Sequence, residues 1–259
     1  MRVPIFQIDA FATSPFTGNP AAVMPLGSWL EDRILQSIAA ENNLSETAFL
    51  VLEPSGWRIR WFTPELEIDL CGHATLASAF VLFEELGVAG PTVILQSQSG
   101  PLAVSRKGDL IELDFPSRPP LPCPVPAGLL ESLGLAPQEV LKARDHMLVL
   151  GSEAEVRELQ PDFSAFAKVD VFSAIVTAPG DSVDFVSRFF SPFAGVPEDP
   201  VTGSAHCTLV PYWAGRLGKS SLHALQVSKR GGELFCEDRG PRIAIAGRAV
   251  KVIEGHFEF

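Results

Sequence analysis

The stretch that decides the fold is WFTPELEIDLCGHA, residues 61–74, because the chain contains a second copy of its pattern. The second copy is FFSPFAGVPEDPVTGSA, residues 189–205, which carries a short insertion. Each copy has an aromatic pair, a hydroxyl residue, a proline and an acid, followed by Gly, a polar residue and Ala. An internal repeat indicates a repeated architecture. We therefore expect two similar halves, each of which presents a helix N-terminus and polar side chains to a shared cleft.

Both copies lead into segments that are apolar on nearly every face, one from Ala74 to Leu86 and one from Ala205 onward. A helix that is apolar all round must be buried on all sides. We therefore predict that each half is a curved sheet or partial barrel wrapped around a central apolar helix. Two core helices in a generic sandwich would be buried in the same way. That alternative leaves unexplained why both helices begin with Gly and a polar residue.

The rest of the chain has the pattern of short strands with few helices. Segments rich in β-branched and aromatic residues alternate with Gly, Pro and Ser, as at residues 5–9, 47–52 and 57–62. One early helix is expected where Ser28 and Glu31 match a capping box. This pattern predicts an α+β protein rather than a parallel βαβ sheet.

A proline-rich segment, PSRPPLPCPVP at residues 116–126, is the best candidate for the boundary between the halves. So many prolines exclude a helix interior and a central strand, and they favour a semi-rigid connector. We expect an N-terminal half at 1–116 and a C-terminal half at 117–259, whose last few residues are free to pack back on the N-terminal half.

Composition limits the function classes. The net charge of −11 argues against a nucleic-acid partner and against docking on an anionic membrane. Asp9 interrupts the apolar core that an export signal would need, and the apolar run at 74–83 is too short to span a bilayer. The four cysteines have neither Cys-x-x-Cys nor zinc-type spacing. We expect a cytoplasmic protein with reduced thiols, no metal, and no phosphate or dinucleotide motif.

The start of each repeat helix is a candidate anion site. A helix N-terminus presents free N–H groups to an anion such as a carboxylate, and Gly72 and Gly203 would let a ligand approach the backbone closely. His73 and Ser204 would then lie at matching positions beside that anion. Either motif alone fits a simple helix start, but two copies in matching context favour a binding function.

Four motifs occur in order along the chain: FTGNP at 16–20, SETAF at 45–49, LCGHAT at 70–75 and EDPVTGSA at 198–205. Together they resemble the phenazine-biosynthesis PhzF-like family over most of the chain. The resemblance implies the diaminopimelate-epimerase-like fold, with two pseudo-symmetric halves and the site between them. It also implies an isomerase that needs no cofactor and a homodimer.

Epimerases and racemases of the wider fold use two cysteines, one from each half. Cys71 occupies the first such position, but the second is held by Thr202, whose hydroxyl is far too weak an acid. Cys71 equally fits a buried structural residue. An amino- or imino-acid epimerase or racemase is therefore the alternative hypothesis. A non-catalytic small-molecule-binding member of the fold is a third.

The resemblance instead implies carboxylate-based isomerisation with Glu46 as the base. Glu46 stands where an apolar strand begins, and burial there would suit it to take and return one proton. In the family's reaction type an allylic proton moves on a small cyclic carboxylate, as in trans-2,3-dihydro-3-hydroxyanthranilate isomerase. The resemblance makes Glu46, His73 and Asp199 catalytic. It implies that four further residues bind the substrate, namely Ser45, Gly72, Gly203 and Ser204.

Overall fold

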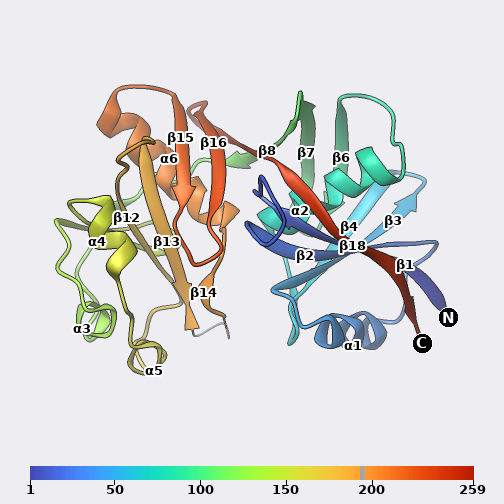
Figure 1. Ribbon diagram of the computed structural model, residues 1–259, viewed down its shortest axis with the longest axis horizontal. Helices are drawn as coiled ribbons and strands as arrows, with labels where there is room; N and C mark the ends of the chain where they lie inside the picture. Colours follow the sequence, from blue (N-terminus) through green and yellow to red (C-terminus); the bar gives the residue numbers. More distant parts are fainter. Residues whose placement is uncertain (193–195) are drawn as a thin grey trace. The chain divides into compact units, whose positions relative to one another are not determined.

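The computed structural model describes residues 1–192 and 196–259. The chain divides into two compact units (Figure 1). Unit 1 comprises Met1–Phe115 and Ile245–Phe259, and unit 2 comprises Pro116–Ala244. Residues 245–259 belong to unit 1 because the last strand pairs antiparallel with the first, from Arg2 opposite Glu258 to Ala10 opposite Ala249.

Unit 1 is built on a mixed sheet. Its strands are β1 (Arg2–Ala10), β2 (Asn19–Leu26), β3 (Glu46–Glu53), β4 (Gly56–Phe62), β5 (Glu67–Ile68), β6 (Thr92–Ser97), β7 (Gly100–Lys107), β8 (Leu110–Pro116) and β18 (Ala249–Glu258). They pair in the order β18-β1-β2-β3-β4-β6-β7-β8, with β5 also on β4. The pairs β2–β3 and β4–β6 are parallel and the others are antiparallel.

The helix α2 (Gly72–Phe80) lies against β1, β2, β3 and β18 of unit 1 (Figure 1). Every residue from Gly72 to Ala79 is buried, which explains why this segment has no polar face. The chain continues directly into a π-helix, η1 (Val81–Glu85).

The other helix of unit 1, α1 (Asp32–Asn42), buries Leu35, Ile38 and Ala39 against a cluster that includes Phe49 and Phe62. The predicted capping box of Ser28 and Glu31 is wrong. The N-cap residue is Glu31, which makes no side-chain cap hydrogen bond. The Glu31 carboxylate instead accepts a hydrogen bond from Arg33, so it does not return to the backbone.

Unit 2 is also mostly strands. They are β9 (Leu121–Pro122), β10 (Glu139–Lys142), β11 (His146–Val149), β12 (Ala174–Pro179), β13 (Phe185–Ser191), β14 (Val196–Asp199), β15 (Ser221–Gln226), β16 (Gly232–Asp238) and β17 (Arg242–Gly247), which runs past the unit's end. The described pairings follow the order β9-β10-β11-β12-β13-β15-β16, with β14 also on β13. The pairs β11–β12 and β13–β15 are parallel.

Within its described residues, unit 2 has three short helices, α3 (Leu129–Leu133), α4 (Glu153–Glu158) and α5 (Phe163–Phe166), and one long helix, α6 (Gly203–Leu217). The long helix packs against β15 and β16, and its Trp213 donates a 3.0 Å hydrogen bond to Thr177 of β12. Gly218 ends it in the left-handed conformation, with φ of 67°. The expectation of a mostly-strand protein with few helices is confirmed.

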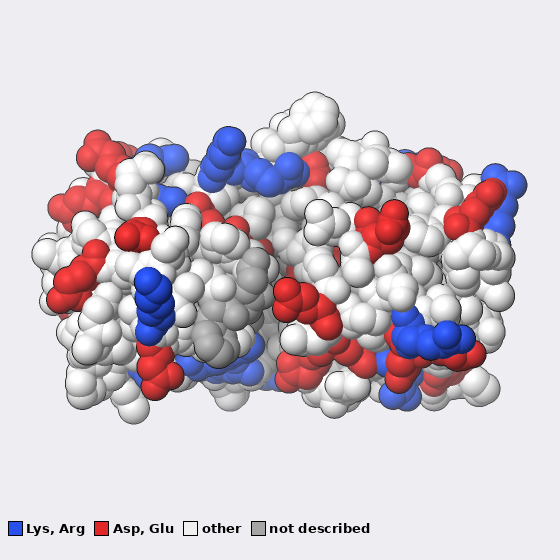
Figure 2. All heavy atoms as spheres, turned by 90° about the horizontal axis from the view of Figure 1, so that it is seen from below, with Lys and Arg blue, Asp and Glu red and all other residues white. Residues whose placement is uncertain are grey.

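The described helices and surface can be compared with the expectations about membrane spans and about a basic nucleic-acid-binding face. Among the described residues, no helix combines the length and apolar character needed to span a membrane. Figure 2 shows one face of the molecule, where acidic and basic side chains intermingle. The described part of this face therefore offers a mixed charge pattern rather than one continuous basic area.

Candidate active site

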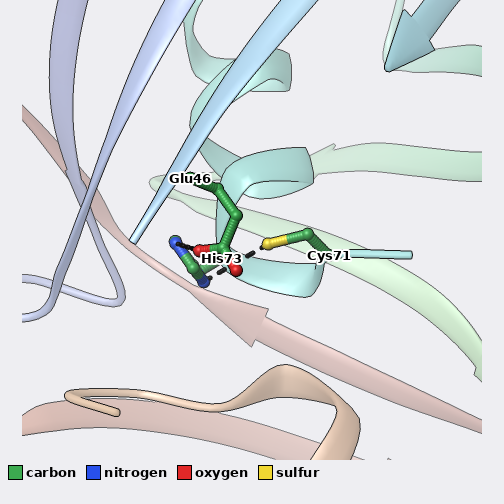
Figure 3. Close-up of side chains that lie close together, drawn as sticks. All are labelled: Glu46, Cys71 and His73. Atoms are coloured by element: carbon green, nitrogen blue, oxygen red, sulfur yellow. Dashed lines mark hydrogen bonds and ion pairs between the residues drawn. The ribbon is translucent and has the colours of Figure 1, made fainter. Parts of the chain in front are cut away.

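The side chains of Glu46, Cys71 and His73 meet in unit 1 (Figure 3). Asn43 closes α1 in the left-handed conformation, and three residues later Glu46 begins β3. The parallel register of β2 and β3 sets Glu46 opposite Ala21. Cys71 is the N-cap of α2 and His73 is its second residue. The site therefore lies where a strand start and a helix start converge.

The imidazole ring of His73 contacts the Glu46 carboxylate at one nitrogen and the Cys71 thiol at the other (Figure 3). Glu46 Oε2 is 3.1 Å from His73 Nε2, and the two side chains are only 15% and 4% exposed. These two atoms are close enough for an ion pair but lack the alignment of a hydrogen bond. In enzymes without bound substrate, hydrogen bonds between catalytic groups are often long or poorly aligned. On the other ring nitrogen, Cys71 Sγ lies 3.5 Å from His73 Nδ1.

Burial keeps the Cys71 thiol protonated. It raises the pKa of Cys71 to about 11, and the negative charge of Glu46 adds to this effect. Cys71 is therefore neutral at pH 7, which does not suit it to act as a thiolate base.

The pKa of His73 lies well above its ordinary value. Burial alone would lower it, but negative charge on Cys71 and on Glu46 outweighs burial. Because Cys71 is a thiol at neutral pH, the charge that favours the imidazolium there comes from Glu46. The Glu46–His73 pair can therefore hold and share a proton.

These three residues also offer the donor types of a metal site, with one potential ligand atom each within 4.8 Å of one another. A metal ion would need the thiolate and the carboxylate around a single imidazole nitrogen. Here Cys71 approaches Nδ1 and Glu46 approaches Nε2. Contacts to both ring nitrogens fit a proton relay better than a metal centre.

One contact of His73 was not expected from the sequence. Asn19, the first residue of β2, is fully buried, and its Nδ2 lies 3.1 Å from His73 Nδ1. The residue belongs to the FTGNP motif, but neither its spacing nor its type predicted a partner. Of the expected substrate-binding residues in unit 1, Ser45 is half-buried just before β3, and Gly72 is the buried first residue of α2.

The other expected site residues lie in unit 2, at the corresponding helix start. Asp199 ends β14, and its Oδ2 accepts a 2.5 Å hydrogen bond from the Thr202 hydroxyl. Gln226 fixes this corner, since its Nε2 donates to the Asp199 carbonyl and its Oε1 accepts from the Thr202 N–H. Gly203 and Ser204 are the first two residues of α6, buried and half-buried respectively. Each unit thus has an acid near the start of its buried helix. In unit 1 Glu46 contacts His73 of α2, and in unit 2 Asp199 lies four residues before α6.

Comparison with known proteins identifies the family of this chain. The profile of the family described as phenazine biosynthesis-like protein matches residues 8–255. The chain belongs to this family. An uncharacterized isomerase of Pseudomonas aeruginosa is 52% identical over 255 residues, covering 98% of both chains. The crystal structure of a PhzF-family phenazine biosynthesis protein from Enterococcus faecalis superposes with a TM-score of 0.97 at 50% identity, covering 100% of both chains.

A more distant structure shows the breadth of the fold. A hydroxyproline epimerase from Agrobacterium vitis has a TM-score of 0.61 at 10% identity, covering 98% of this chain and 92% of its own. At this identity the likeness shows the fold alone, which the PhzF family and this epimerase share. The expected family is confirmed, and the chain is an isomerase of the PhzF family.

Proposed function

We propose that this PhzF-family protein is a cofactor-independent isomerase that moves a proton on a small cyclic carboxylate by acid–base catalysis at Glu46. One observation carries the proposal: a largely buried carboxylate lies 3.1 Å from a buried imidazole at the start of a helix. A positioned carboxylate can accept a proton from carbon and return it, and its imidazole neighbour can stabilise or relay that proton.

In the proposed reaction Glu46 removes an allylic proton from one ring carbon. The electrons of that C–H bond form a new C=C bond, and the former double bond supplies the pair that accepts a proton at the other end of the allylic system. Glu46 exchanges its proton with solvent through His73 and then delivers a proton to that second carbon. Substrate and product have the same composition, so the reaction needs no oxidant, reductant or second substrate.

The remaining expected residues take supporting roles in this proposal. Asp199 orients the polar substituents of the substrate or relays protons, and the substrate carboxylate is bound by Ser45, Gly72, Gly203 and Ser204. Buried helix starts supply N–H groups suited to a carboxylate. The proposal includes the doubled architecture, with a curved sheet around each of the two apolar helices. A cytoplasmic homodimer without nucleic-acid or membrane partners is part of it and rests on the sequence and the family.

The specific substrate that we propose is trans-2,3-dihydro-3-hydroxyanthranilate or a close analogue. Incubation of the native protein with this compound should shift its ultraviolet spectrum as the double bond moves. Heat-inactivated protein is the control for spontaneous rearrangement. If this compound is not turned over but another cyclic carboxylate from a panel is, the proposed substrate is wrong and the proposed isomerase activity stands.

The racemase alternative has less support. Cys71 is a neutral buried thiol, and Thr202 is engaged with Asp199 and Gln226. The non-catalytic alternative predicts a ligand that binds without any exchange of its protons with solvent. Calorimetric binding measured beside proton exchange separates it from the isomerase.

A further inference from the structure

The Nδ1 atom of His73 is contacted by two groups that carry hydrogen-bond protons. The Asn19 amide nitrogen lies 3.1 Å away, and the Cys71 sulfur lies 3.5 Å away. An amide NH₂ is a donor, and a protonated thiol is a weak donor. On the opposite side of the ring, Nε2 faces the Glu46 carboxylate, which in its ionised form only accepts.

This pattern of partners selects one tautomer. A neutral imidazole has one N–H and one bare nitrogen, and the hydrogen bond made by one nitrogen decides where the proton sits. Donors at Nδ1 require that nitrogen to be bare. The carboxylate at Nε2 requires the proton there. Both sides of the ring therefore favour the same assignment.

We propose that Asn19 is a positioning residue, whose side-chain amide donates to His73 Nδ1 so that the neutral ring carries its proton on Nε2, toward Glu46. The catalytic consequence rests on the proposed function of the Glu46–His73 pair. Asn19 touches no reacting atom in this scheme and acts only through the imidazole. Its complete burial at the start of β2 holds the amide in place.

The alternative arrangement is well defined. If the Asn19 amide were rotated so that its oxygen faced Nδ1, that nitrogen would carry the proton. A bare Nε2 would then meet the Glu46 carboxylate, which would have to be protonated to make a hydrogen bond. The two arrangements differ in a quantity that can be measured without substrate.

The test is the nitrogen NMR spectrum of the full-length protein labelled with ¹⁵N-histidine, titrated to the pH at which His73 is neutral. A bare ring nitrogen resonates far downfield of a protonated one, so the spectrum reports the tautomer directly. The chain has five histidines, and His73→Gln assigns the signal. We expect a bare Nδ1 and a protonated Nε2.

His206 provides an internal reference of the opposite kind. Its Nδ1 lies 2.8 Å from the Thr202 carbonyl oxygen, which can only accept. Burial lowers the pKa of His206 to about 4, so the ring is neutral through most of the titration. Its spectrum should show a protonated Nδ1, which calibrates the reading for His73.

The variant Asn19→Asp keeps the shape of the side chain but can only accept at neutral pH. It should move the His73 proton to Nδ1 and lower kcat with little change in KM, by about 10- to 100-fold if Asn19 matters as much as the outer-shell partners of metal-ligating histidines do. Asn42→Asp is the matched control, because Asn42 is a part-buried asparagine of unit 1 that donates to Thr47. It should leave the His73 tautomer unchanged.

A neutral His73 with its proton on Nδ1 in the native protein would overturn the proposal, as would an unchanged tautomer in folded Asn19→Asp. If that variant fails to fold, the native spectrum alone still decides. Failure of the proposed function would appear differently, as a correct tautomer in a protein that exchanges no substrate proton.

Discussion

Glu46 Oε2 and His73 Nε2 lie 3.1 Å apart in unit 1, although the two residues belong to a strand start and a helix start with a complete β-hairpin between them in the chain. The contact is nearly removed from solvent, which strengthens the interaction between the two groups. The pair therefore has the features of an acid–base couple.

Replacing His73 by Gln should lower kcat about 100-fold, because the imidazole partner of Glu46 is lost and general acid–base groups typically contribute 10²–10⁴-fold. Steady-state kinetics measure this change. Urea unfolding serves as the control that the variant is folded. A kcat within twofold of the native value would remove His73 from the mechanism.

Cys71→Ala should retain most of the activity, within about threefold, because the thiol is buried and protonated rather than a base. Removing the sulfur from a packed position should cost about 1 kcal/mol of the free energy of unfolding. Alkylating reagents should likewise leave the native protein active at pH 7. Loss of activity by more than 100-fold in a folded Cys71→Ala variant would favour the thiol-based racemase instead.

Arg188 should be a major stabilising residue of unit 2. Its side chain is 10% exposed, makes two hydrogen bonds to the Glu198 carboxylate, and donates to the carbonyls of Val156 and Leu159. Arg188→Met should lower the free energy of unfolding by about 3–5 kcal/mol, because it leaves a carboxylate and two carbonyls without their partner.

The exposed ion pair between Arg33 and Glu31 supplies the matched control for Arg188. Its side chains are 78% and 70% exposed. Arg33→Met should change the free energy of unfolding by less than about 1 kcal/mol. Chemical denaturation of both variants makes the comparison, and similar losses in the two would contradict the assignment.

His206 should make stability depend on pH. Burial lowers its pKa to about 4, whereas the unfolded chain has the ordinary value near 6.5. Between these values the unfolded state binds the extra proton, so stability is fully present above pH 6.5 and is lost as the pH falls toward 4. The loss should reach about 3 kcal/mol.

The measurement is the difference in free energy of unfolding between pH 7 and pH 4 for the native protein and for His206→Gln. Carboxylates with lowered pKa, such as Asp184, add to the acid loss in both proteins. Only the contribution of His206 should disappear in the variant. Equal pH slopes in the two proteins would show that His206 is not buried as a neutral ring.

The two buried helices could be predicted from the sequence because a segment without a polar face has only one solution in a soluble fold, which is burial on all sides. The start of α1 could not be predicted in this way. The Glu31 carboxylate accepts a hydrogen bond from Arg33, and the capping-box pattern does not take such a partner into account. The change from α2 to a π-helix at Val81 also has no signal in the spacing of apolar residues.

The site was predicted only in part, and for a related reason. Glu46 and His73 were singled out through the family motifs, whereas their contact depends on the register of β2 and β3 and on where α2 begins. Asn19 lies in the FTGNP motif, but a single asparagine before proline has the pattern of a turn and predicts no contact with a histidine. Its contact with His73 arises from tertiary structure alone.

The role of Glu46 as the base is tested most directly by deuterium incorporation from heavy water into the isomerised product, measured for the native protein and for Glu46→Gln. Gln keeps the size of the side chain but cannot accept a proton from carbon. With the native protein we expect deuterium at the carbon that receives the proton, and with a folded Glu46→Gln variant we expect a reaction at least about 100-fold slower. Turnover and deuterium incorporation by Glu46→Gln at the native rate would contradict it.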